Sequence, residues 1–130
     1  MVGMAPRFTP VEQMPVAQIR IDGQPMEVRL AQTSAHKAQG FQGADAQTLA
    51  EEMIYFSWQI PKRPSFHMRN VKSPLAIAWI DAEEHVVGVD IMEPEESGYR
   101  PPLPVNAALE LAPQRAESLG IGVGSTIERE

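Results

Sequence analysis

Alternating apolar and polar positions near the N-terminus predict a β-hairpin. Residues Val16–Ile21 place Ala17, Ile19 and Ile21 on one face and mostly polar side chains on the other, as expected of a strand with one buried face. Asp22 and Gly23 follow directly, and this dipeptide is a strong hairpin signal. Residues 26–31 form the predicted returning strand.

Further along the chain, segments rich in β-branched and aromatic residues predict more strands. They span residues 53–58, 66–69, 75–81, 85–92, 106–111 and 123–127. The prolines of 61–64 are expected to break the first of these, and the proline-rich stretch 94–104 is expected to be a long loop.

Two or three short helices are predicted between these strands. The first covers residues 34–39, with Thr33 as its N-cap and Gly40 just after its C-terminus, which are the residue types favoured at those positions. A second is expected at 46–51. The third is expected at 114–119, because Pro113 suits the first helical position.

Together these elements predict an α+β domain with a mainly antiparallel sheet and two or three short helices. The number of strands and hairpins suggests a small, barrel-like sheet. The chain has 130 residues, the usual size of one domain. We expect residues 1–15, which show no periodicity, to form a loose N-terminal arm, and residues 16–130 to form a single β-rich domain.

Charge and composition exclude several classes of function. The formal net charge is −6, and the densest basic segment is the pair Lys62 and Arg63, whereas a nucleic-acid-binding protein needs a basic face. We therefore expect neither nucleic acid nor an anionic membrane as a partner. No segment has the length of apolar sequence that a membrane-spanning helix requires.

Cofactor and metal signatures are not expected either. The chain has no cysteine, so it has no disulfide, no thiolate zinc site and no cysteine nucleophile. Its histidines, His36, His67 and His85, lack the spacing of a metal motif. The glycine-rich segment 120–124 follows a helix and precedes a strand, whereas a phosphate-binding loop precedes a helix.

Candidate binding chemistry centres on Arg69 and Asn70. His67 and Arg69 share one face of the predicted strand 66–69, and Asn70 begins the following turn. A guanidinium group beside an amide can bind a carboxylate or phosphate. Alternatively, Arg69 pairs with Glu110 or Asp81, and Asn70 stabilises the turn.

Two acidic residues are candidates for acid–base chemistry. Glu110 lies between Leu109 and Leu111, so alternation places it on the opposite face of its strand, which is expected to be solvated. If it pointed inward instead, its pKa would rise and it could act as a general acid or base. Asp81 ends a strand, where capping of the turn is the expected role.

Several sequence blocks resemble one known family, catalogued as domain of unknown function 192, an uncharacterised ancient conserved region. The strongest block is F-H-M-R-N at 66–70 followed by P-L-A-I-A-W-I-D at 74–81. Further blocks occur in the family's order at 33–42, 52–56, 109–111 and 116–124. The resemblance covers about residues 16–128.

This resemblance implies a small, β-barrel-like fold and frequent export to the periplasm or beyond, although a cytoplasmic location is also open. It implies no activity and no catalytic residues, because none is established for the family. Departures from the family pattern include His67 for Trp, Val71 for Thr, Ala76 for Asp and Ser125 for Asp, and residues 40–42 keep the family's G-L-M only loosely.

Three hypotheses about function follow. The leading one is a non-catalytic binding or accessory domain whose polar patch, Arg69 and Asn70 with His67 and Glu110 nearby, binds a small anion or a protein partner. The second is a small enzyme that uses Glu110 or Asp81 as acid or base while Arg69 holds an anionic substrate. The third is a structural or oligomerisation module. No cofactor is expected in any of them.

Overall fold

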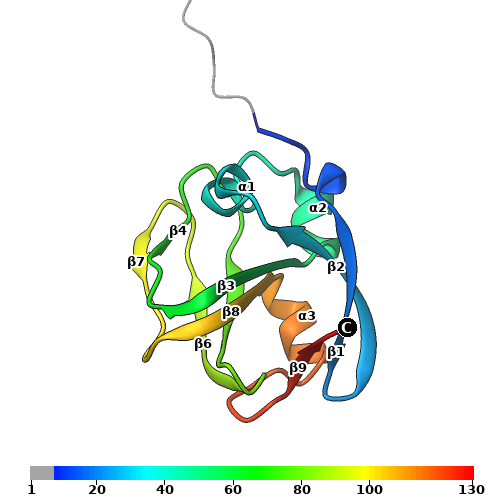
Figure 1. Cartoon of the computed structure of the whole chain (residues 1–130). Helices are drawn as coiled ribbons and strands as arrows, with labels where there is room; N and C mark the ends of the chain where they lie inside the picture. Colours follow the sequence, from blue (N-terminus) through cyan, green and yellow to red (C-terminus); the bar gives the residue numbers. More distant parts are fainter. Residues whose placement is uncertain (1–7) are drawn as a thin grey trace, which may run out of the picture.

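The computed structural model describes residues 8–130 of the protein (Figure 1). Its helical segments are the 3₁₀ turn η1 (Val11–Gln13), α1 (Ser34–Gln39), α2 (Ala46–Glu51) and α3 (Pro113–Ser118). Its strands are β1 (Val16–Ile21), β2 (Gln24–Ala31), β3 (Ile54–Lys62), β4 (Phe66–His67), β5 (Leu75–Ile80), β6 (Val86–Met92), β7 (Ser97–Tyr99), β8 (Val105–Leu111) and β9 (Ile127–Arg129). The α+β class predicted from the sequence is confirmed.

One mixed sheet of seven strands forms the centre of the fold, in the order β6-β5-β8-β3-β2-β1-β9. Neighbouring strands run antiparallel except β2 and β3, which run parallel. Strands β4 and β7 form a separate two-stranded sheet. The α1 and α2 helices lie in the connection between β2 and β3. Because these strands are parallel, a short hairpin turn cannot join them and a longer connection is needed.

The prediction of a barrel was wrong, because the main sheet is not closed. Its edge strands β6 and β9 approach at one corner through an isolated bridge between His85 and Thr126. Closure requires a continuous ladder of hydrogen bonds between the first and last strands. The short β9 pairs with β1 over only three residues and forms no such ladder with β6 in the described part of the chain.

The central strands are buried on both faces. All six residues of β5 are buried, and so are six of the seven residues of β8. One apolar cluster, which includes Ile54, Phe56 and Trp79, fills one face of the sheet. A second cluster, which includes Leu109 and Ala116 of α3, fills the other. A polar residue in the buried part of β8, residues 107–111, is therefore surrounded by protein on either face.

Some predicted boundaries differ from the structure at prolines and glycines. Pro61 does not break β3 but lies inside it, between Ser57 and Lys62, where the ladder with β8 shifts register. A residue without an N–H is tolerated at such a break. The predicted strand 123–127 is instead a turn with Gly124 at φ +94°, followed by β9. The predicted loop 94–104 contains the short strand β7.

The N-terminal segment, predicted as a loose arm over residues 1–15, has buried residues in its described part. Val11 and Met14 belong to the core. The Thr9 backbone N–H donates to Gln39 Oε1 at 2.8 Å, which ties this segment to the end of α1. Residues 1–7 lie outside the described residues. Within residues 8–130, no helix has the length and apolar character to cross a membrane.

Candidate functional site

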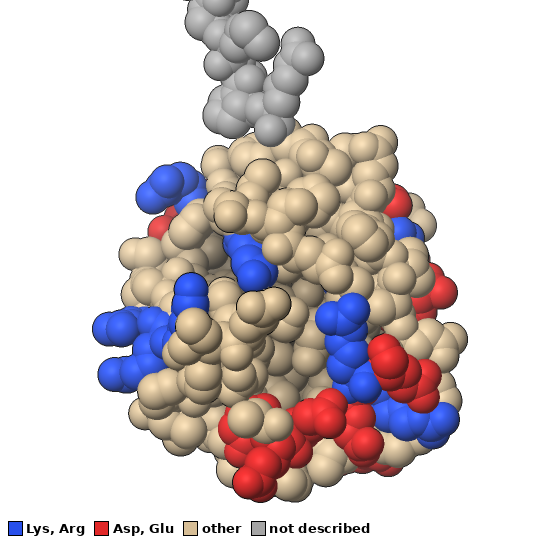
Figure 2. Space-filling view, viewed as in Figure 1, with Lys and Arg blue, Asp and Glu red and all other residues tan. Residues whose placement is uncertain are grey.

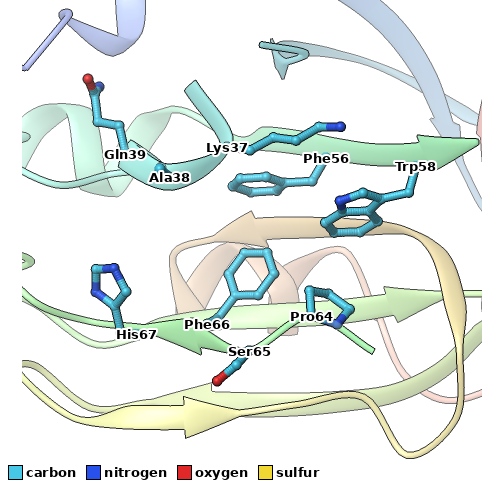
Figure 3. A pocket seen from close by; sticks show the side chains of 10 residues that line it. Lys37, Ala38, Gln39, Phe56, Trp58, Pro64, Ser65, Phe66 and His67 are labelled. Atoms are coloured by element: carbon cyan, nitrogen blue, oxygen red, sulfur yellow. The ribbon is translucent and has the colours of Figure 1, made fainter. Parts of the chain in front are cut away.

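A cleft of about 370 Å³ opens between α1 and β4. Helix α1 forms one wall, the segment before and within β4 forms the other, and aromatic side chains of β3 lie between them (Figure 3). The lining residues are Lys37, Ala38, Gln39, Gly40, Phe56, Trp58, Pro64, Ser65, Phe66 and His67. This is the size range of pockets that hold small ligands.

Aromatic rings give the cleft a flat apolar interior. Phe66 meets Phe56 edge to face, with ring centroids 5.0 Å apart, and meets Trp58 in the same manner at 6.4 Å. Phe66 also packs against the buried Trp79 at 5.4 Å. Phe56 and Trp79 are core, whereas Trp58 and Phe66 are only partly buried and line the cleft.

Lys37 and His67 supply the polar groups of the cleft. The Lys37 ammonium lies 5.6 Å from the Trp58 ring centroid, within the range of a cation–π contact. His67 Nδ1 accepts a hydrogen bond from the Arg69 backbone N–H at 3.1 Å, so the ring proton is on Nε2 and this nitrogen is a donor. The labelled polar ends of Gln39 and Ser65 point away from the aromatic rings (Figure 3).

The end of α1 positions the cleft against the sheet. Thr33 caps the start of the helix by accepting from the His36 backbone N–H, as predicted. Gly40 ends it with φ +52° and ψ −127°, a conformation that residues with a Cβ rarely adopt. A Cβ on Gly40 would lie 3.1 Å from Glu110 Oε1 and 3.6 Å from Phe56. The carboxyl group of Glu110 therefore lies directly beneath the backbone of Gly40.

Glu110 points into the core instead of into solvent. Its cross-strand partners are Ile54 on β3 and Ile77 on β5, which belong to the same apolar cluster as Phe56. The residue is 4% exposed, and within residues 8–130 no hydrogen bond joins its carboxyl group to another group. Desolvation by burial raises the pKa of Glu110 to about 8, so the group is protonated at neutral pH.

The expected solvated position of Glu110 was therefore wrong, although the alternation behind it was correct. Glu110 does lie on the face of β8 opposite to Leu109 and Leu111. That face is not solvated, because the aromatic cluster and the end of α1 cover it.

Arg69 and Asn70 occupy the turn after β4. Asn70 has φ +62°, a conformation that asparagine tolerates. Its side-chain Nδ2 donates to Gln42 Oε1 at 3.1 Å, and its backbone N–H donates to Glu95 Oε1 at 3.2 Å. Asn70 thus joins two loops. Arg69 is exposed, and within residues 8–130 its guanidinium has no ion pair with Glu110 or Asp81.

Asp81 lies far from this turn, at the other end of β5. Its Oδ1 accepts hydrogen bonds from the backbone N–H groups of Glu83 and His85, both at 2.9 Å. These contacts are those of a turn-capping carboxylate. The backbone N–H of Asn70 donates to Glu95, which follows the end of β6. That end of β6 pairs with the start of β5, whereas Asp81 follows the end of β5. The structure therefore does not bring Asp81 and Arg69 together.

Sequence reasoning missed Lys37, Trp58 and Phe66 as members of one site. Lys37 sits on a short helix whose charged side chains are expected to be solvated, and its contact with Trp58 joins segments far apart in the chain. On the face shown in Figure 2, Lys and Arg side chains border a central hollow, whereas Asp and Glu gather at the lower edge. A cluster assembled by folding leaves no local motif.

Comparison with known structures supports the fold over nearly the whole chain. A protein of unknown function from Novosphingobium aromaticivorans DSM 12444 is 28% identical, with a TM-score of 0.79 over 96% of this chain and 93% of that chain. A Sinorhizobium meliloti 1021 protein, provisionally described as a transcription regulator, is 18% identical, with a TM-score of 0.75 over 89% of this chain and 95% of that chain. The second likeness shows the fold alone.

Sequence comparison identifies the family. A search among curated proteins finds no match. The sequence pattern of DUF192, described as an uncharacterized ACR, matches residues 17–129, which include the cleft, Glu110 and the turn at Arg69. The chain therefore belongs to the DUF192 family.

Proposed function

We propose that this chain is a non-catalytic binding domain that holds a small ligand in the cleft between α1 and β4. The observation that carries the proposal is the open cleft of about 370 Å³, lined by Phe56, Trp58 and Phe66 and bordered by Lys37 and His67. Apolar walls with a few polar groups are typical of ligand sites. Aromatic side chains at such walls contribute most of the binding free energy in many sites.

The alternative of an enzyme is less well supported. A general acid or base must come within hydrogen-bonding distance of its substrate. Glu110 is only 4% exposed, and neither Glu110 nor Arg69 is among the residues that line the cleft. Asp81 is held by the turn that it caps. An oligomerisation module would rest on the large exposed apolar side chains of residues 8–130 (Val16, Ile60, Ile91, Leu103 and Val123), none of which lines the cleft.

A neutral two-ring probe tests whether the cleft binds ligands. We expect 2-naphthalenemethanol, titrated into ¹⁵N-labelled protein, to shift the amide resonances of residues 37–40 and 65–67 and to change the fluorescence of Trp58, because these groups line the cleft. Shifts confined to another surface, or no shifts at millimolar concentration, would contradict the proposal.

A pair of variants on one helix provides the control. Ala38 and Ala35 are both exposed on α1, but only Ala38 lines the cleft. We expect Ala38→Trp to fill the cleft and weaken binding by about ten-fold or more, equivalent to at least ~1.4 kcal/mol. Ala35→Trp adds the same side chain outside the cleft and should leave binding unchanged. Arg69→Ala then shows whether the polar patch at Arg69 and Asn70 contributes to the same site.

We also propose that the protein acts outside the cytoplasm, because its sequence resemblance to this family implies frequent export. Fractionation of the native organism's cells, probed with an antibody against this chain, should place it with a periplasmic or extracellular marker enzyme. Co-fractionation with a cytoplasmic marker would contradict this part of the proposal.

A further inference from the structure

We infer that the cleft between α1 and β4 is selective for planar aromatic anions, such as an aryl carboxylate. The inference rests on the proposed function, since it names the class of ligand that the cleft would hold. The aromatic part of the ligand follows from the shape and lining of the cleft, and the anionic part follows from its charge.

The planar part of the ligand matches the ring arrangement. Phe56 and Trp58 are nearly parallel, with an interplanar angle of 11°, and Phe66 stands almost perpendicular to both, at 83° and 87°. In Figure 3, Phe66 rises from β4 toward Phe56, while Trp58 and Pro64 lie farther along the cleft. A flat ring can stack on Trp58 and meet Phe66 at its edge, which are the favoured aromatic geometries.

The charge of the lining favours an anion. Lys37 places a cation next to the Trp58 ring, and His67 contributes an Nε2–H donor from the opposite wall. Within residues 8–130, no Asp or Glu lines this cleft. The chain as a whole carries a net charge of −6, which opposes the approach of anions. A preference for an anion must therefore come from these local groups.

Glu110, the carboxyl group beneath the cleft, does not oppose this preference. Its burial keeps it protonated at neutral pH, so it adds no negative charge below the aromatic floor. Among the described residues that line the cleft, Lys37 is the one Lys or Arg, and its ammonium lies 5.6 Å from the Trp58 ring centroid.

A series of probes that share one ring system tests the inference. The probes are 2-naphthoate, neutral 2-naphthalenemethanol and the cation 2-naphthylmethylammonium, titrated at low salt and neutral pH. We expect 2-naphthoate to bind about three- to ten-fold more tightly than the neutral probe, as for one partly exposed charge contact. The cation should bind most weakly. Added salt should reduce the difference.

Variants of Lys37 assign the preference to one side chain. Lys37→Gln should make the affinities for 2-naphthoate and the neutral probe about equal, and Lys37→Arg should preserve the preference. Lys72→Gln removes an exposed lysine that does not line the cleft and should leave the preference unchanged. This control separates a local effect from a change in net charge.

The outcomes separate the two proposals. If all three probes bind equally, if the cation binds best, or if Lys37→Gln keeps the preference, the inference about charge fails while the binding function stands. If no probe shifts the resonances of the cleft, the proposed function fails and the inference fails with it. A preference for 2-naphthoate that only Lys37→Gln abolishes supports both.

Discussion

Replacing Glu110 with Gln should stabilise the protein above about pH 8. It should also remove most of the loss of stability that ionisation of Glu110 causes as the pH rises. The pKa of Glu110 is raised by burial from 4.5 to about 8 in the folded protein. Between these values, the folded state keeps a proton that the unfolded state releases. The free energy of unfolding therefore falls as pH rises, by up to about 1.4 kcal/mol per pH unit.

Below the unfolded pKa, both states are protonated and Glu110 contributes no pH dependence. Above the folded pKa, the loss is complete and the contribution is flat again. Gln has nearly the same shape and no charge, so the variant avoids the ionised carboxylate in an apolar core. Its amide brings hydrogen-bonding groups that also need partners. We therefore expect little gain near pH 5 and a clear gain near pH 9.

Urea denaturation across this pH range, at fixed ionic strength, measures the effect as a difference between variant and wild type. That difference cancels the contributions of other titrating groups when they are unaffected by the substitution. Glu117→Gln is the control, because Glu117 is exposed on α3 and its substitution should give a difference that hardly changes with pH. A Glu110→Gln difference that is equally flat would show that the carboxyl group is not held protonated in the core.

The sequence predicted the local elements well because their signals are local. The hairpin at Asp22 and Gly23, both ends of α1 and the strand β5 follow from turn residues, caps and apolar runs. The open sheet and the parallel pairing of β2 with β3 depend instead on contacts between distant segments. The short β7 has no apolar run to mark it.

The candidate site was predicted only in part, for the same reason. His67 was identified and does line the cleft. Glu110 was placed on the correct face of its strand, but the cover over that face comes from α1, about seventy residues earlier in the chain. The contact of Lys37 with Trp58 likewise joins α1 to β3. Hydrophobic periodicity predicts each of these elements but not a contact between them.

Gly40→Ala should be strongly destabilising, by roughly 1–3 kcal/mol from backbone strain. Its φ of +52° and ψ of −127° lie outside the left-handed helical region that some residues with a side chain adopt. The new Cβ would also lie 3.1 Å from Glu110 Oε1, which is closer than ordinary contact. Urea denaturation measures the loss. Gly122→Ala is the control, because a Cβ there meets nothing within 4 Å.

A double-mutant cycle with Glu110→Ala separates the two causes of that loss. Backbone strain at Gly40 does not depend on residue 110, whereas the close contact with Oε1 disappears when the carboxyl group is removed. We therefore expect Gly40→Ala to be less destabilising in the Glu110→Ala background, with a coupling of about 0.5 kcal/mol or more. Equal losses in both backgrounds would mean that Gly40 is required only for its conformation. A reduced loss would show that the absence of a side chain at Gly40 makes room for the buried acid beneath the cleft.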